Sequence, residues 1–134
     1  MKLENLEDNK GCFVCGLDNP EGLRLQFRSL DGGKKVETTF IPGPKYQGWK
    51  NVVHGGIILT LLDEVMAKAA QYSGFHVLTG AIEARFKTPA IILEPLRLEA
   101  EIESVKKKVV YAKATAYKED GTIVAQAKGK LVLI

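Results

Sequence analysis

The sequence predicts an α+β domain in which a long antiparallel sheet wraps around one long central helix. One apolar run of about 16 residues is typical of a buried helix, and alternating strand patterns precede and follow it. The turns between the later strands are short, and short turns join antiparallel neighbours. A sheet curled around an apolar helix buries both elements. We expect a single domain over residues 1–134, with residues 1–11 loosely ordered.

The helix is predicted over residues 57–72. This run is rich in Leu, Met, Ala, Glu, Lys and Gln, which are good helix formers, and Gly74 suits a left-handed C-terminal cap. The run is apolar on almost every face, so the helix should be buried on most sides. It is shorter than the ~20 residues of a membrane span and carries Asp63, Glu64 and Lys68. A buried carboxylate costs several kcal/mol unless it is paired, so Asp63 and Glu64 are the first functional candidates.

Alternating apolar and polar residues predict six strands around this helix. Strands are expected over residues 23–28, 36–40, 76–87, 96–103, 109–118 and 123–133. Asp31, Gly32 and Gly33 should form a hairpin turn between the first two. The last two strands are rich in Ala and Gly, which would let the helix approach closely.

The composition and charge of the chain exclude several classes of function. The chain has 134 residues, 46% hydrophobic and 26% charged, which is ordinary for a soluble globular protein. A net charge of +3, without a basic cluster interleaved with aromatics, does not indicate nucleic acid, although it favours an anionic small ligand. There is no signal peptide pattern, and two cysteines make no disulfide scaffold. These features favour a reduced, cytoplasmic protein that binds neither nucleic acid nor membrane.

The two cysteines, Cys12 and Cys15, are spaced like a metal-binding or redox pair. A closed zinc site needs four ligands, and the chain offers one pair. A site of four thiolates shared by two subunits is an alternative, but buried free thiols are favoured. A redox pair expects a following helix within a βαβ unit, which the pattern lacks. The prediction is therefore no metal and no cofactor.

The start of the helix can bind a polarised oxygen. His54, Gly55 and Gly56 stand where backbone N–H groups have no intrahelical partner and where the positive end of the helix dipole lies. Glycines let a ligand approach the backbone. Such a site can polarise a carbonyl, as an oxyanion hole does.

The spacing of Gly55 and Asp63 predicts a dimer if both act on one substrate. They are eight residues apart, or ~12 Å along one helix, too far to reach the same carbon. If two helices pack antiparallel across a two-fold axis, Asp63 of one subunit faces Gly55 of the other. The symmetry then creates two equivalent sites.

These residues resemble a known family. His54-Gly55-Gly56, followed by Asp63-Glu64, preceded by Gln47-Gly48 and followed by Phe86-Lys87-Thr88-Pro89-Ala90, resembles the PaaI-like branch of the hotdog-fold acyl-CoA thioesterases. The pattern Cys12-x-x-Cys15-Gly16-x-x-Asn19-Pro20-x-Gly22 is similar to the opening of many members. The resemblance covers residues 12–133. It implies a hotdog fold, edge-to-edge dimers that often pair into tetramers, and hydrolysis of an acyl-CoA thioester.

The resemblance also implies roles for single residues. Asp63 matches the catalytic carboxylate, as nucleophile or as base on water, and Gly55 matches the amide that polarises the thioester. His54 matches a histidine near the thioester. The loop amide that assists matches Gln47 best, with Asn51 competing, and Thr79 matches a hydroxyl that positions the water. Further expected substrate or CoA contacts are Asn51, Gly56, Glu64, Arg85, Lys87, Thr88, Lys50 and the turn of Lys106, Lys107 and Lys108.

Other interpretations stay open at this point. Asp63 could be a paired core carboxylate with Glu64 as the active group, His54 a structural histidine, and Thr79 an ordinary strand residue. The same fold could also act as a dehydratase or hydratase on acyl thioesters, using His54 with a carboxylate. A non-catalytic acyl-CoA binding protein is the third possibility.

Overall fold

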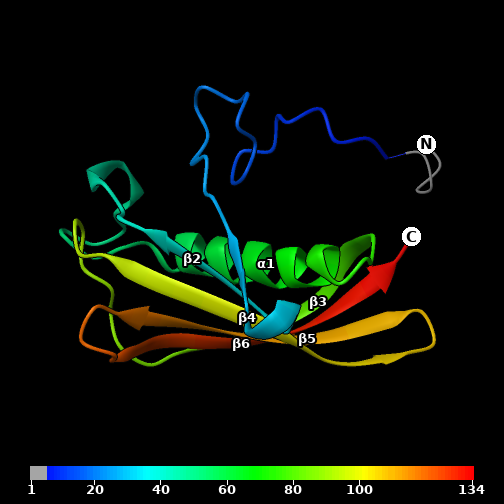
Figure 1. Cartoon of the computed structure of the whole chain (residues 1–134). Helices are drawn as coiled ribbons and strands as arrows, with labels where there is room; N and C mark the ends of the chain where they lie inside the picture. Colours follow the sequence, from blue (N-terminus) through cyan, green and yellow to red (C-terminus); the bar gives the residue numbers. More distant parts are fainter. Residues whose placement is uncertain (1–5) are drawn as a thin grey trace.

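A computed structural model describes residues 6–134. One long helix lies across one face of a curved six-stranded sheet, and the N-terminal segment passes over the helix on the side away from the sheet (Figure 1). The strands are β1 (Arg28–Leu30), β2 (Lys35–Phe40), β3 (Val77–Phe86), β4 (Leu96–Lys106), β5 (Val109–Lys118) and β6 (Ile123–Leu133). The helix α1 spans Gly55–Tyr72, and two short 3₁₀ turns, η2 (Asp31–Gly33) and η3 (Pro44–Tyr46), precede it.

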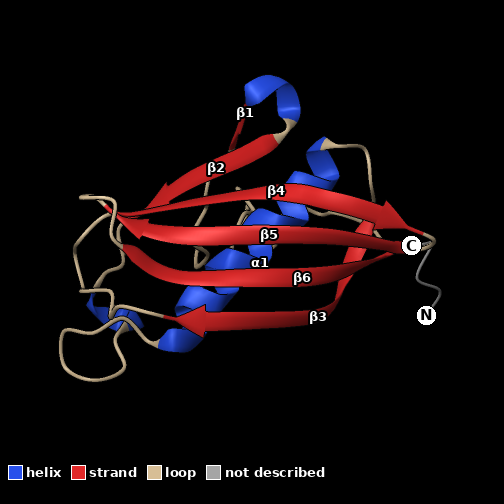
Figure 2. Ribbon diagram, turned by 90° about the horizontal axis from the view of Figure 1, so that it is seen from below, coloured by secondary structure: helices blue, strands red, loops and turns tan. Residues whose placement is uncertain are grey.

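The sheet is antiparallel throughout, with the order β1-β2-β4-β5-β6-β3. Figure 2 shows β3 at one edge and β1 with β2 at the other, with α1 crossing behind the central strands. This confirms the predicted antiparallel sheet wrapped around one helix. The edge position of β3 matters most for function, because its outer edge pairs with no strand among residues 6–134.

The core lies between α1 and the concave face of the sheet. The helix residues buried there are Ile58, Leu61, Leu62, Val65, Met66, Ala69 and Ala70. The strand residues beneath the helix are small, among them the buried alanines 112, 114, 116, 125 and 127. A Cβ atom added at Gly129 would lie 3.0 Å from the Met66 Sδ atom. The close approach of helix and sheet predicted from these small residues is therefore confirmed.

Both ends of α1 follow from local sequence. The helix begins at Gly55, two residues before the predicted start, because His54 caps it. At the other end Gly74 has φ +89°, the left-handed conformation predicted for it. No helix among residues 6–134 is long and apolar enough to cross a membrane.

The first predicted strand was wrong in extent. Residues 23–27 lie outside the sheet, Arg24 has a left-handed φ of 52°, and β1 begins only at Arg28. The Leu23 N–H donates to the Phe13 carbonyl and the Leu25 N–H to the Val14 carbonyl, at 2.8 and 3.0 Å. The alternating pattern thus reflects pairing with the N-terminal segment. Of the predicted loose segment 1–11, residues 1–5 lie outside the described residues, and residues 6–11 contain no helix or strand.

A β-bulge interrupts β3 near its start. The register to β6 shifts between Thr79 and Ala81, which leaves Gly80 as the extra residue. A Cβ atom at position 80 would lie 2.8 Å from a Val132 methyl group, so the close approach to β6 requires glycine. The bulge shifts the alternation by one residue. Thr79 therefore shares the helix-facing side with Ile82, although strict alternation would put them on opposite faces.

Candidate active site

His54 caps the helix with its side chain. Its Nδ1 atom accepts a hydrogen bond of 2.8 Å from the Gly56 N–H. The backbone N–H of His54 donates to the Tyr46 carbonyl at 2.9 Å. With Nδ1 as acceptor, a neutral imidazole carries its proton on Nε2. The ring is exposed, and it packs beside Gly48 of the preceding loop. His54 thus orients the first turn and offers an N–H donor to solvent.

The Gly55 N–H is a free donor at the start of α1, where His54 and Gly55 form the corner between the loop and the helix. It donates to no acceptor within residues 6–134, as expected for the first residue of a helix. The glycine is exposed, and an added Cβ atom would meet only the Phe86 ring, at 3.7 Å. Phe86 ends β3 and is itself 55% exposed. An amide N–H at the positive end of α1, with an apolar ring beside it, can polarise a thioester carbonyl.

The loop before the helix holds Gln47 and Asn51. The Gln47 Oε1 atom accepts a 3.1 Å hydrogen bond from the Asn51 N–H, and Asn51 adopts a left-handed φ of 65°. The loop is also closed by a bridge between Gln47 and Val53. The amide oxygen of Gln47 therefore stabilises the loop, and its NH₂ group is the part left to contact a ligand.

Asp63 lies on α1 two turns beyond Gly55 and faces β3. The Thr79 hydroxyl donates a 2.6 Å hydrogen bond to the Asp63 Oδ1 atom. The bulge at Gly80 directs the Thr79 side chain toward the helix. One carboxylate oxygen is thereby fixed, and the other, Oδ2, stays available to accept a proton from water.

The Gly55 N–H and the Asp63 carboxylate, the two halves of the candidate site, lie far apart within one chain. Gly55 and Asp63 belong to the same unbroken helix, so eight residues of rise, ~12 Å, separate them. Each half contacts a different end of β3: Asp63 binds Thr79, and Gly55 packs on Phe86. The contribution of Phe86 was not predicted, although the residue stands in the Phe86-Lys87-Thr88-Pro89 motif.

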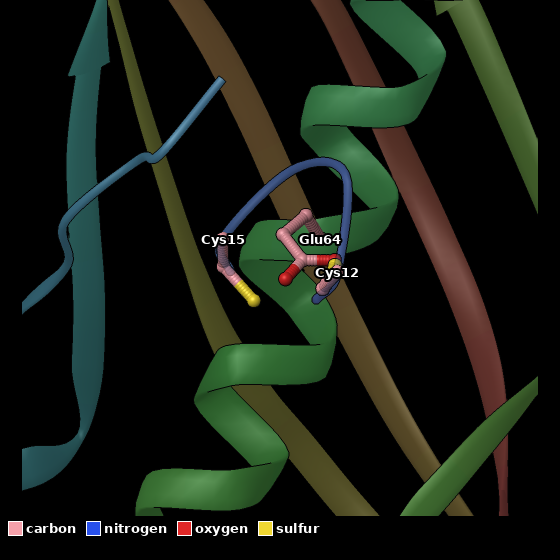
Figure 3. Close-up of side chains that lie close together, drawn as sticks. All are labelled: Cys12, Cys15 and Glu64. Atoms are coloured by element: carbon pink, nitrogen blue, oxygen red, sulfur yellow. The ribbon is translucent and has the colours of Figure 1, made fainter. Parts of the chain in front are cut away.

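The remaining candidates lie in several places. Glu64 points toward the thiols of Cys12 and Cys15 (Figure 3), whereas Asp63 faces Thr79 on β3. Arg85 borders a shallow hollow on the outer face of the sheet with Lys113 and Lys128. Lys107 and Lys108 form the turn between β4, which ends at Lys106, and β5. The Leu133 N–H of β6 donates to the Lys108 carbonyl, and Leu133 pairs with Val77 at the start of β3.

Lys87, Thr88 and Lys50 lie nearer the corner of His54 and Gly55. Lys87 and Thr88 follow Phe86 directly, and both donate their N–H groups to the Val124 carbonyl. Lys50 stands in the loop between Gln47 and His54 and is exposed. Lys87 and Thr88 thus follow the end of β3, whereas the lysine turn lies near its start.

Comparison with known proteins places the chain in a family. The family model described as the thioesterase superfamily matches residues 50–125, more than half of the chain, including α1 and the strands β3 to β5. The chain therefore belongs to the thioesterase superfamily.

Individual relatives agree with this assignment. The chain is 28% identical over 97 residues to the acyl-coenzyme A thioesterase THEM5 of Mus musculus, a match that covers 72% of this chain and 39% of that protein. The chain thus spans well under half the length of that relative. The crystal structure of a thioesterase superfamily protein superposes with TM-score 0.85 and 26% identity, over 93% of this chain and 61% of the other.

The fold also matches the PaaI protein of E. coli. That structure superposes with TM-score 0.76 at 20% identity, over 82% of this chain and 83% of the other. The predicted hotdog fold and the predicted resemblance to PaaI-like proteins are confirmed.

Proposed function

We propose that the protein hydrolyses the thioester of a small or medium acyl-CoA to the free acid and CoA, at sites shared by two subunits. One observation carries this proposal: the carboxylate of Asp63 and the amide of Gly55 are held at opposite ends of the edge strand β3, whose outer edge has no partner among residues 6–134. The name of the THEM5 relative supports acyl-CoA as the substrate class.

The edge of β3 provides the dimer contact. All ten of its residues are partly or fully exposed, and a long unpaired edge is a template for a second strand. A copy related by a two-fold axis would pair with it antiparallel. With the bulge residue Gly80 left out of the count, Glu83 lies midway between Thr79 and Phe86. Pairing centred on Glu83 therefore sets Thr79 of one copy opposite Phe86 of the other.

This pairing would assemble the reaction centre. Thr79 is hydrogen-bonded to Asp63 at 2.6 Å, so Asp63 lies at the Thr79 end of β3. The Phe86 ring lies 3.7 Å from a Cβ atom added at Gly55, so Gly55 lies at the other end. Asp63 of one copy would therefore lie beside Gly55 of the second copy. Two such sites form per dimer, because the operation is symmetric.

The chemistry needs few groups. The Gly55 N–H stabilises the negative charge that develops on the thioester oxygen. The free oxygen of Asp63 takes a proton from water, whose oxygen forms the new bond to the acyl carbon. The carbon–sulfur bond then breaks, and the electron pair leaves on the CoA sulfur, which is stable as a thiolate. Direct attack by Asp63, followed by hydrolysis of the anhydride, is the other route open to this carboxylate.

The basic residues near the corner suit the CoA phosphates. Lys87, which directly follows β3, and Lys50 of the preceding loop flank the corner of His54 and Gly55, and we assign phosphate contacts to them in preference to Arg85. Trp49, which is 86% exposed in the same loop, is available for an apolar part of the ligand. His54 contributes its Nε2 proton as a donor near the thioester.

The test is thiol release from a panel of acyl-CoAs. The wild-type protein should release thiol from at least one, and Asp63→Asn should lower kcat by ~10²-fold or more, because the proton acceptor is lost. No release from any acyl-CoA, or full activity in Asp63→Asn, would refute the proposal. Loss of enoyl-CoA absorbance without thiol release would instead indicate a hydratase.

A further inference from the structure

Three potential metal ligands lie together on the face of α1 that the N-terminal segment covers. The Sγ atoms of Cys12 and Cys15 and a carboxylate oxygen of Glu64 are all within 4.8 Å of one another. All three residues are partly buried. Figure 3 shows the loop arching over the helix, with both thiols and the carboxylate gathered in one space. The proposed hydrolysis uses none of these groups.

The loop around the two cysteines is tightly built. The Gly16 N–H donates to the Cys12 carbonyl at 2.8 Å, and the Val14 N–H donates to the Cys12 Sγ atom at 3.4 Å. A Cβ atom at Gly16 would lie 2.5 Å from backbone atoms of Lys10 and Cys12, so only glycine fits. An N–H group aimed at sulfur is the kind of outer contact that orients a metal-bound thiolate.

The neighbours of Cys15 in this cluster oppose the ionisation of its thiol. Burial, the hydrogen bond to Glu64 and the negative charge of Glu64 raise the pKa of the Cys15 thiol to about 12. Two thiolates and one carboxylate carry three negative charges, and a divalent cation together with the nearby Lys68 ammonium would neutralise them.

We propose that Cys12, Cys15 and Glu64 bind a thiophilic divalent cation, for which Zn²⁺ is the best match. Thiolates select zinc over magnesium or calcium, which prefer oxygen ligands. Among residues 6–134 no further His, Cys, Asp or Glu joins the group, so water completes a tetrahedral site.

The role of this site would be structural. It joins the loop of residues 12–16 to the middle of α1, next to the buried side chains of Val14 and Leu25. The sequence prediction of no metal counted only the two thiols. The third ligand became visible when the fold placed Glu64 beside them, and no sequence spacing indicates that contact.

The experiment uses the full chain, stripped with a chelator under reducing conditions and then titrated with Zn²⁺ against a chromophoric competitor. We expect one zinc per chain, with Glu64→Gln and Cys15→Ser each weakening binding by ~10-fold or more. Co²⁺ should give the intense visible bands of a tetrahedral site and a thiolate charge-transfer band. Asp63→Asn is the matched control on the adjacent helix residue and should bind zinc like wild type.

Three results would overturn the proposal. The first is no stoichiometric binding to the wild-type protein, which needs no variant to fold. The second is one zinc per two chains with Glu64→Gln unaffected, because that indicates four thiolates shared between subunits. The third is a Cys12–Cys15 disulfide in the isolated protein together with no metal uptake after reduction. Since Asp63→Asn keeps the metal site and loses the hydrolase activity, failure of one proposal is distinguishable from failure of the other.

Discussion

At the scale of single residues, the hydrogen bond between Thr79 and Asp63 is the most informative contact. A hydroxyl that donates to a carboxylate fixes which oxygen is free to act, and this bond is short, at 2.6 Å. The same contact decides between the two interpretations of Thr79. A strand residue without a functional role tolerates a β-branched apolar replacement, whereas a residue that positions the catalytic carboxylate does not.

We predict that Thr79→Val lowers kcat by ~10-fold or more, with KM little changed, because a hydrogen bond to a charged group is lost. Thr79→Ser keeps the hydroxyl and should retain most of the activity. The melting temperature is measured alongside, because a loss of kcat without a matching loss of stability identifies a positioning role. Equal kcat in Thr79→Val and the wild type would show that Thr79 is only a strand residue.

At the scale of elements, the position of α1 on the sheet controls both halves of the site. Asp63 and Met66 lie one turn apart on this helix, and Met66 is fully buried against Gly129 of β6. A larger residue at position 129 must displace either the methionine or the helix. The small residues of the last strands therefore set the distance between α1 and the sheet. That distance in turn sets the position of the Asp63 carboxylate relative to β3.

We predict that Gly129→Val lowers the free energy of unfolding by ~2 kcal/mol, within the range for overpacking a core. Chemical denaturation with urea measures it. Lys128→Val, at the neighbouring outward-facing position, is the control and should change stability by less than ~0.5 kcal/mol. If both variants unfold alike, the close packing of α1 on β6 is not what positions the helix.

Most of the elements could be predicted because their patterns are local. The helix and the four later strands follow from periodicity, and the ends of α1 follow from His54 and Gly74. The strand predicted over residues 23–28 failed because its partner is the N-terminal segment, and alternation does not identify a partner. The lone Gly80 within a strand pattern was a signal for the bulge.

The site was predictable in part for a similar reason. Gly55 and Asp63 stand on one helix at a spacing that can be counted, so their separation was evident. The contacts that cross between elements were not, because they depend on long-range packing: Phe86 on Gly55, and Glu64 beside the thiols of Cys12 and Cys15. Glu64 and Asp63 are adjacent in sequence, yet the helix turns them toward different neighbours.

At the scale of the whole molecule, the claim is that a functional site needs two chains. Two inactive variants test this, because each damages a different half. Asp63→Asn removes the carboxylate. Gly55→Pro removes the N–H donor at the first helical position, where proline is well tolerated, and His54 already has the extended φ and ψ of −60° and 133° that precede a proline.

The decisive measurement is thiol release after the two variants are unfolded together and refolded as a mixture. Each mixed dimer would contain one intact site, built from Asp63 of the proline variant and Gly55 of the asparagine variant. We predict that the mixture recovers about a quarter of wild-type activity, as random pairing of two subunits dictates, while each variant refolded alone stays inactive. A mixture as inactive as its components would contradict the shared site.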